Sequence, residues 1–261
     1  MNKKFDKSYR IISNKEICTD YFELKVKAPA AAGYCYPGQF FMISIPGVFL
    51  RRPVSIYDVK KDTVSFLYKI TGKGTKILSE IKSETIQLLG PLGNGYDLPP
   101  NTASSSLKSE KKSPGFSPVI IAGGTGIASV HFLAAKLKTR GTLYYGARSK
   151  KDLLCLNKFR KIGWKIIVST EDGSKGHKGY ITNILPENLK SGDTLFACGP
   201  MPMLKKILQI AKEKNIRGFA SLEEIMACGV GNCQGCAVKI KGQNKMTCKD
   251  GSIFKIEDID F

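Results

Sequence analysis

The chain has few acidic residues and few arginines. Its 261 residues include 22 Asp and Glu against 41 Lys and Arg, and only seven of these cations are Arg. The formal net charge of +19 would suit nucleic acid, an anionic membrane surface or an acidic partner. The lysines are dispersed, however, and direct reading of bases favours Arg. We therefore expect no nucleic-acid binding, and either a solvated Lys-rich surface or an acidic partner accounts for the charge.

An export signal and a membrane span are also missing from the pattern. The N-terminus reads MNKKFDKSYR and lacks the apolar core of a secretory signal. Residues 113–135 carry no charge, but Pro114, Pro118 and several glycines favour a buried strand, turn and helix over a span. We expect a cytoplasmic protein with reduced thiols and no membrane contact. In that compartment a dense cysteine group indicates a metal site more than disulfides.

The order of segments predicts four parts. Residues 1–102 contain short β-segments at regular spacing with Gly and Pro between them, which predicts an antiparallel barrel. Residues 103–117 are rich in Ser and Lys and predict a linker or insertion. In residues 118–215 apolar strands alternate with helical segments, which predicts an α/β domain with a doubly wound parallel sheet. Residues 216–261 form a small cysteine module.

The cysteine module carries the most specific motif. Its spacing is Cys228-x4-Cys233-x2-Cys236-x11-Cys248. This arrangement is typical of plant-type [2Fe–2S] ferredoxins rather than of paired CxxC zinc knuckles. A zinc site built from the same four thiolates is the alternative.

Two glycine-bearing turns follow predicted strands of the α/β domain. The first comprises Gly123, Gly124, Thr125 and Gly126, and the second comprises Cys198, Gly199 and Pro200. Turns at the carboxyl ends of parallel strands, before helices, suit a nucleotide pyrophosphate. The first turn lacks the GxGxxG spacing, so plain close packing is an alternative. A third turn, at residues 169–174, is expected at the same edge.

The barrel segment contains two motifs that suit an anion. Arg51 and Arg52 precede Pro53 in a strand, and a buried Arg needs an anionic partner. Gly74 and Thr75 form a turn after which a helix is expected to begin, again suited to phosphate. Together they suggest a bound dinucleotide, although a plain surface Arg pair would give the same sequence.

These motifs, in this order, resemble the ferredoxin–NADP reductase superfamily, and within it the electron-transfer subunits of class 1B dihydroorotate dehydrogenase. The resemblance covers nearly the whole chain and implies FAD, a [2Fe–2S] cluster and NAD. The implied FAD contacts are Arg52, Pro53, Val54, Ser55, Leu67, Tyr68, Lys69, Gly74 and Thr75. The implied NAD contacts are Gly123, Gly124, Thr125, Gly126, Cys198, Gly199 and Pro200. The implied iron ligands are Cys228, Cys233, Cys236 and Cys248.

The resemblance also implies a function. A partner subunit that holds FMN oxidises dihydroorotate, and electrons pass through the cluster and FAD of this chain to NAD+ in pyrimidine biosynthesis. A heterotetramer of two plus two subunits is implied, with no catalytic acid or base in this chain. The first alternative is an NAD(P)H-linked flavoprotein reductase that serves ferredoxin or sulfur. That family tends to have Asp at the position of Cys228. A zinc-bearing nucleic-acid-binding module is the remaining alternative.

Overall fold

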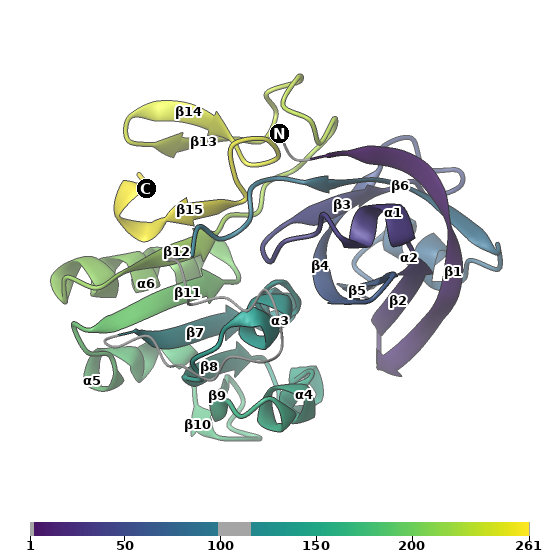
Figure 1. Cartoon of the computed structure of the whole chain (residues 1–261). Helices are drawn as coiled ribbons and strands as arrows, with labels where there is room; N and C mark the ends of the chain where they lie inside the picture. The colour runs from purple at the N-terminus through teal and green to yellow at the C-terminus, as the bar shows by residue number, and fades with distance from the viewer. Residues whose placement is uncertain (1–2, 99–115, 261) are drawn as a thin grey trace. The chain divides into compact units, whose positions relative to one another are not determined.

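The computed structural model describes residues 3–98 and 116–260. It divides into two compact units, each discontinuous in sequence. The first contains Met1–Gly95 and Glu223–Ile253, and the second contains Tyr96–Leu222 and Phe254–Phe261. The chain therefore leaves the first unit, builds most of the second, returns, and ends in the second (Figure 1).

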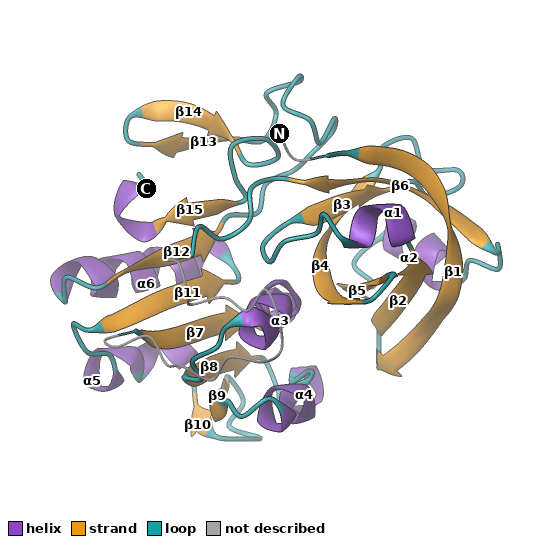
Figure 2. Cartoon of the chain, in the orientation of Figure 1, coloured by secondary structure: helices purple, strands orange, loops and turns teal. Residues whose placement is uncertain are grey.

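The first unit contains a closed antiparallel barrel in the order β1-β2-β5-β4-β3-β6 (Figure 2). This confirms the predicted barrel. Two short helices lie between the strands. The elements are β1 (Phe5–Cys18), β2 (Tyr21–Lys27), α1 (Pro29–Ala32), β3 (Phe40–Ile43), β4 (Arg52–Lys60), β5 (Thr63–Lys69), α2 (Lys73–Ser79) and β6 (Thr85–Leu92). Helix α2 begins at Lys73, so the prediction that it starts after Thr75 is wrong: both turn residues lie inside its first turn.

The cysteine segment joins the barrel in the same unit. Its hairpin consists of β13 (Ala237–Ile240) and β14 (Gln243–Met246). The segment packs on the barrel through a common apolar cluster. This cluster contains Phe40, Met42 and Leu92 from the barrel side and Met226, Cys236 and Cys248 from the cysteine side.

The second unit is a seven-stranded sheet in the order β10-β9-β8-β7-β11-β12-β15. The strands are β7 (Ser117–Gly123), β8 (Thr142–Ala147), β9 (Lys165–Thr170), β10 (His177–Lys178), β11 (Asp193–Cys198), β12 (Arg217–Ser221) and β15 (Ile253–Lys255). The helices are α3 (Ile127–Lys136), α4 (Leu156–Lys161), α5 (Leu185–Asn188) and α6 (Met201–Glu213). The first six strands in this order, from β10 at the edge to β12, all pair in parallel. This confirms the predicted doubly wound sheet. The chain order reverses between β7 and β11, and ligands of such sheets bind at this point.

The predicted four-part division differs from these two units. The expected boundary at residue 216 lies just before β12, which pairs with β11 in the sheet. The chain after the cysteine hairpin returns to the same sheet as β15. Non-local strand pairing of this kind leaves no local sequence pattern. Most of the expected linker at 103–117 lies outside the described residues.

Candidate redox and nucleotide sites

The four clustered cysteines lie in two pairs. The Sγ atoms of Cys236 and Cys248 are 3.3 Å apart. Cys228 Sγ accepts hydrogen bonds from the backbone N–H groups of Val230 and Cys233, each at 3.5 Å. The predicted ligand residues are therefore brought together, with one pair in the loop and the other at the base of the hairpin.

The hairpin explains why Cys236 and Cys248 meet. Ala237 pairs with Met246 across β13 and β14. Beyond that pair, the Thr247 N–H donates to the Cys236 carbonyl at 3.0 Å. This places Cys236 opposite Thr247, directly before Cys248. A turn then follows β14, in which the Lys249 and Asp250 N–H groups both donate to the Met246 carbonyl. The hairpin and this turn therefore bring together two thiols that eleven residues separate in the sequence.

Two glycines shape the loop that carries Cys228 and Cys233. Gly229 and Gly231 have φ values of +71° and +87°, a region that disfavours side chains. A Cβ at Gly229 would lie 2.6 Å from Met42 Cγ, and one at Gly231 would lie 2.6 Å from Lys249 Cδ. The loop therefore lies close to the barrel on one side and to the Lys249 stem on the other.

The thiols differ in how easily they ionise. Burial acts to raise the pKa of Cys228, but backbone hydrogen bonds from Cys233 and Val230 outweigh it and lower that pKa to about 6. Burial, together with the neighbouring Cys236, raises the pKa of Cys248 to about 12. Exposure differs as well, since Cys233 is exposed while Cys236 and Cys248 are buried.

Paired thiols fit a two-iron cluster. A [2Fe–2S] centre takes four cysteine thiolates, two on each iron, whereas zinc takes all four around one point. In the described part of the chain, no group of three or more His, Cys, Asp or Glu side chains is placed to hold one metal ion. The backbone N–H groups that reach Cys228 Sγ are the kind of donors that stabilise cluster sulfurs.

Arg52 and Gly74, both predicted to contact FAD, lie against each other. Arg52 Nε is 3.1 Å from the position that a Cβ on Gly74 would take. Arg52 Nη1 donates to the Leu50 carbonyl at 2.7 Å. Because Gly74 has no side chain, the Arg52 guanidinium can approach the first turn of α2. An anion bound at this turn would therefore interact with the positive charge of Arg52.

Thr75 closes this turn. Its Oγ1 accepts the N–H groups of Thr71 and Gly72 at 2.9 and 3.3 Å, and its hydroxyl donates to the Gly72 carbonyl at 3.1 Å. Thr75 therefore shapes the turn beside Arg52.

The other predicted FAD residues lie on β4 and β5. Pro53, Val54 and Ser55 pair with β3. Tyr68 is buried, stacks on Phe22 and donates to Asn14 Oδ1 at 3.0 Å. Lys69 Nζ lies 4.7 Å from the centre of the Tyr21 ring.

The two predicted NAD turns are in contact in the second unit. A Cβ on Gly126 would clash with the carbonyl group of Cys198. One on Gly199 would lie 3.0 Å from the Gly123 backbone nitrogen. Strands β7 and β11 are neighbours, so both turns lie at the switch point of the sheet. Thr125 and Pro200 are exposed at this edge.

The third predicted turn follows β9 and is joined to the turn after β8. The Lys150 N–H donates to Ser174 Oγ at 2.7 Å. Ser174 in turn donates to Asp172 through its hydroxyl at 2.6 Å and its N–H at 2.9 Å. These bonds from Ser174 lower the pKa of Asp172. Hydrogen bonds thus join the turns that follow β8 and β9, and the second turn carries the carboxylate of Asp172.

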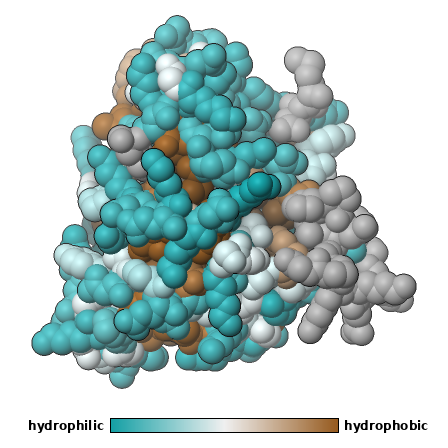
Figure 3. All heavy atoms as spheres, turned by 90° about the vertical axis from the view of Figure 1, so that its left-hand side faces the viewer, coloured by the Kyte–Doolittle hydropathy of each residue, from teal (hydrophilic) through white to brown (hydrophobic). Residues whose placement is uncertain are grey.

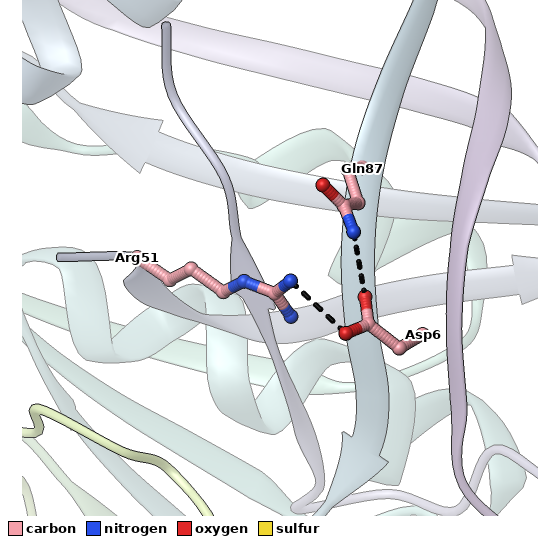
Figure 4. Close-up of polar contacts among 3 residues, drawn as sticks. All are labelled: Asp6, Arg51 and Gln87. Carbon is pink, nitrogen blue, oxygen red and sulfur yellow. Dashed lines mark hydrogen bonds and ion pairs between the residues drawn. The ribbon is translucent and has the colours of Figure 1, made fainter. Parts of the chain in front are cut away.

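Three features had no signal in the sequence. Asp6 accepts a hydrogen bond from Arg51 and another from Gln87 (Figure 4), and Lys249 covers Gly231. A cavity of about 730 Å³ lies beside α6 and contains none of the predicted site residues; it is lined in part by Lys205, Lys212, Arg217, Ile256 and Asp260. The sequence singled out Arg51 together with Arg52, but its partners, the contact of Lys249 and the cavity follow only from tertiary packing.

No helix among the described residues is long and apolar enough to span a membrane. The face drawn in Figure 3 is mostly hydrophilic, with apolar side chains visible between polar ones.

Known proteins similar to this chain agree with both units. The family model of the iron-sulfur cluster binding domain of dihydroorotate dehydrogenase B matches residues 223–260. The model of the oxidoreductase NAD-binding domain matches residues 120–209. The first match covers the cysteine hairpin and favours the predicted cluster over zinc.

Relatives match over nearly the full length. The electron transfer subunit of dihydroorotate dehydrogenase B (NAD(+)) from Caldanaerobacter subterraneus subsp. tengcongensis is 36% identical over 262 residues, or 97% of each chain. The subunit of the same name from Clostridium perfringens is 34% identical over 258 residues, again 97% of each chain. The solved structure of an NADH-dependent reduced ferredoxin-NADP oxidoreductase superposes with a TM-score of 0.82 at 29% identity. The superposition covers 97% of this chain and 89% of the chain of the solved structure.

Fold and site together define an electron-transfer oxidoreductase with the ferredoxin reductase architecture. The chain belongs to the family of electron transfer subunits of dihydroorotate dehydrogenase B (NAD(+)). The family and the fold class expected from the sequence are thereby confirmed.

Proposed function

We propose that this chain carries electrons from dihydroorotate oxidation in a catalytic partner subunit to NAD+, within pyrimidine biosynthesis. The partner holds FMN, the two subunits form a heterotetramer of two plus two, and the complex works in the cytoplasm. The observation that carries the proposal is the grouping of the four cysteines on the barrel: the Cys233 N–H donates to Cys228 Sγ, and the Sγ atoms of Cys236 and Cys248 are 3.3 Å apart. A chain with this site needs an electron donor and an electron acceptor.

The chain's own residues bind and orient the cofactors. We expect the four cysteines to hold [2Fe–2S], and Arg52 with the Gly74 turn to hold the FAD pyrophosphate. The contacting turns after β7 and β11 take the nicotinamide nucleotide. A bound flavin can exchange single electrons with an iron–sulfur cluster and hydride with NAD+. The cluster cannot pass electrons to NAD+ directly, because it carries single electrons whereas NAD+ accepts only hydride.

The net reaction of the complex is dihydroorotate plus NAD+ giving orotate, NADH and a proton. The carbon–hydrogen chemistry belongs to the partner, and this chain does not oxidise dihydroorotate itself. Its two histidines fit this division: His131 is buried, edge-on to Phe159 at 5.3 Å, and His177 is exposed on β10. The chain therefore needs no acid or base of its own.

The test is dihydroorotate-dependent NADH formation by the copurified complex, compared with each subunit alone. We expect NADH only from the complex, while NADH added to this chain alone should bleach its flavin. Purified holo-protein should also show flavin and iron–sulfur absorption. Failure of the complete complex to form NADH would reject the assignment.

A second function is favoured by one observation, the full-length likeness to the NADH-dependent reduced ferredoxin-NADP oxidoreductase at 29% identity. In that case the chain would link NADH to ferredoxin or to sulfur compounds. Reduced ferredoxin offered with NAD+ to the same preparation separates the two. NADH formed from ferredoxin but not from dihydroorotate would favour this second function.

A further inference from the structure

The segment of residues 44–51 joins β3 to β4 and ends directly before Arg52. Its last residue, Arg51, reaches back to β1, where Nη2 donates to Asp6 Oδ2 at 3.0 Å. On the other side of the same carboxylate, Gln87 Nε2 of β6 donates to Asp6 Oδ1 at 3.1 Å (Figure 4). Three segments far apart in sequence thus meet at one carboxylate.

Gln87 also holds the start of the segment. The Ser44 N–H donates to the Gln87 backbone carbonyl at 3.0 Å. Residue 87 therefore fixes the beginning of the segment through its main chain. Through its side chain and Asp6 it also fixes the end. An internal turn, in which the Val48 N–H donates to the Ile45 carbonyl at 3.1 Å, limits the freedom of the residues between.

The position of the Arg52 guanidinium depends on this segment. Arg52 Nη1 donates to the carbonyl of Leu50, at 2.7 Å, and Leu50 is held in place by its neighbour Arg51. On its other edge the guanidinium lies beside Gly74. If residues 50 and 51 move, the acceptor that orients Arg52 moves with them.

Arg51 and Arg52 have different tasks. Consecutive residues of an extended chain point to opposite sides, and here one meets Asp6 while the other meets Gly74. Arg51 Nη1 is buried and has no hydrogen-bond partner among the described residues. Asp6 is therefore the group that compensates the Arg51 charge, and loss of its charge would leave a half-buried cation unpaired.

We propose that Asp6, Arg51 and Gln87 are positioning residues for FAD. They hold the segment 44–51 so that Arg52 presents its guanidinium at the Gly74 turn, and they do not touch the cofactor. This inference rests on the proposed function, because it takes Arg52 as an FAD ligand.

The test is a double-mutant cycle on FAD affinity, measured with the complete chain stripped of flavin and titrated with FAD. Asp6→Asn keeps the shape of the side chain and removes its charge. We expect Asp6→Asn and Arg52→Ala each to raise the FAD dissociation constant about tenfold, the worth of one charge-assisted bond. The double variant should bind FAD no more weakly than Arg52→Ala, because Asp6 acts only through Arg52.

Two further variants separate positioning from general destabilisation. Asp62→Asn breaks another ion pair of the barrel, Lys27–Asp62 at 3.4 Å, and should leave FAD affinity unchanged. Gln87→Ala removes the bond to Asp6 but keeps the Ser44 main-chain bond, and should weaken FAD binding even if Asp6→Asn fails to fold. Thermal unfolding of each apo-protein checks that the fold persists.

The outcomes are distinct. Unchanged FAD affinity in both Asp6→Asn and Gln87→Ala, or additive losses in the cycle, would overturn the positioning role and leave Arg52 as an FAD ligand. Unchanged affinity in Arg52→Ala would overturn this inference together with the FAD site proposed for the chain. The inference is supported if Asp6→Asn weakens FAD binding in the wild-type chain but causes no further loss in a chain that already carries Arg52→Ala.

Discussion

The four cysteines differ in burial, and therefore in how much each contributes to the stability of the fold. Cys233 is exposed, whereas Cys236 is only 2% exposed and packs with Phe40, Met42 and Leu92 of the barrel. A hydroxyl at the buried position would be desolvated with the thiol of Cys248, a weak acceptor, as its neighbour. The two ligands should therefore respond differently to the same substitution.

We predict that Cys233→Ser abolishes the cluster absorption, keeps FAD, and leaves the free energy of unfolding of the apo-chain within about 0.5 kcal/mol. Cys236→Ser should abolish the cluster and also lower that free energy by about 1–2 kcal/mol. Visible absorption and urea unfolding of both apo-proteins measure this. Joint loss of cluster and FAD in Cys233→Ser would contradict independent binding of the two cofactors.

Tyr68 makes the barrel sensitive to alkali. Burial raises its pKa to about 12, although the bond to Asn14 acts to lower it. In the unfolded chain the phenol ionises near 10, so between these values the unfolded state alone loses the proton. The contribution of Tyr68 to stability is therefore complete below pH 10 and is lost as the pH rises toward 12.

Tyr68→Phe should flatten the fall of stability across that window, because phenylalanine has no proton to lose. Urea midpoints measured at several pH values between 10 and 12 give the slope. Tyr34→Phe, at a tyrosine of the same unit that is 44% exposed, is the matched control. Equal slopes in Tyr68→Phe and wild type would contradict the assignment.

At the scale of the elements, the turn after β7 lies in close contact with the end of β11. A Cβ at Gly126 would meet the Cys198 carbonyl, whereas one at Gly192, before β11, would meet nothing within 4 Å. We predict that Gly126→Ala lowers stability by about 2 kcal/mol through overpacking and weakens NADH binding, while Gly192→Ala does neither.

Flavin bleaching by NADH in the chain alone measures the nucleotide site, and thermal unfolding measures the stability. Normal bleaching by Gly126→Ala would show that the contact between the two turns does not shape the site. An equal loss in Gly192→Ala would point to a general effect of alanine in this unit.

Two strands had little local signal. In β1 the only residues buried are Phe5 and Tyr9, four apart, so period-two alternation is absent. In β12 the five residues RGFAS include an arginine and a glycine, and the strand exists because β11 offers a parallel edge. The strands β7, β8, β9 and β11 are mostly apolar and followed from their composition, because strands covered on both faces are apolar throughout.

At the scale of the molecule, the net charge of +19 exceeds what two dinucleotides can compensate. Ion pairs in the described part of the chain include Lys25–Glu23 at 3.1 Å and Lys76–Glu80 at 2.8 Å. Because Lys and Arg outnumber Asp and Glu by 19, pairing within the chain cannot neutralise the excess. If the catalytic partner presents an acidic face, the charge would speed association.

We therefore predict that the affinity for the catalytic subunit falls as ionic strength rises, because salt screens exposed charges beyond about 10 Å at 0.1 M. Titration of one labelled subunit with the other at low and high salt measures it. An affinity independent of salt would leave the lysines as a solvated surface only.

Motif chemistry was local and could be predicted from the sequence alone. The spacing of Cys228, Cys233, Cys236 and Cys248, the glycine turns and the RPVS strand indicated cofactors, because ligand type and spacing limit what can bind. Only the tertiary structure decided that the cysteine hairpin packs on the barrel and that Asp6, itself held by Gln87, pairs with Arg51. Those contacts join residues up to about two hundred positions apart, and packing between distant segments leaves no periodic trace in the chain.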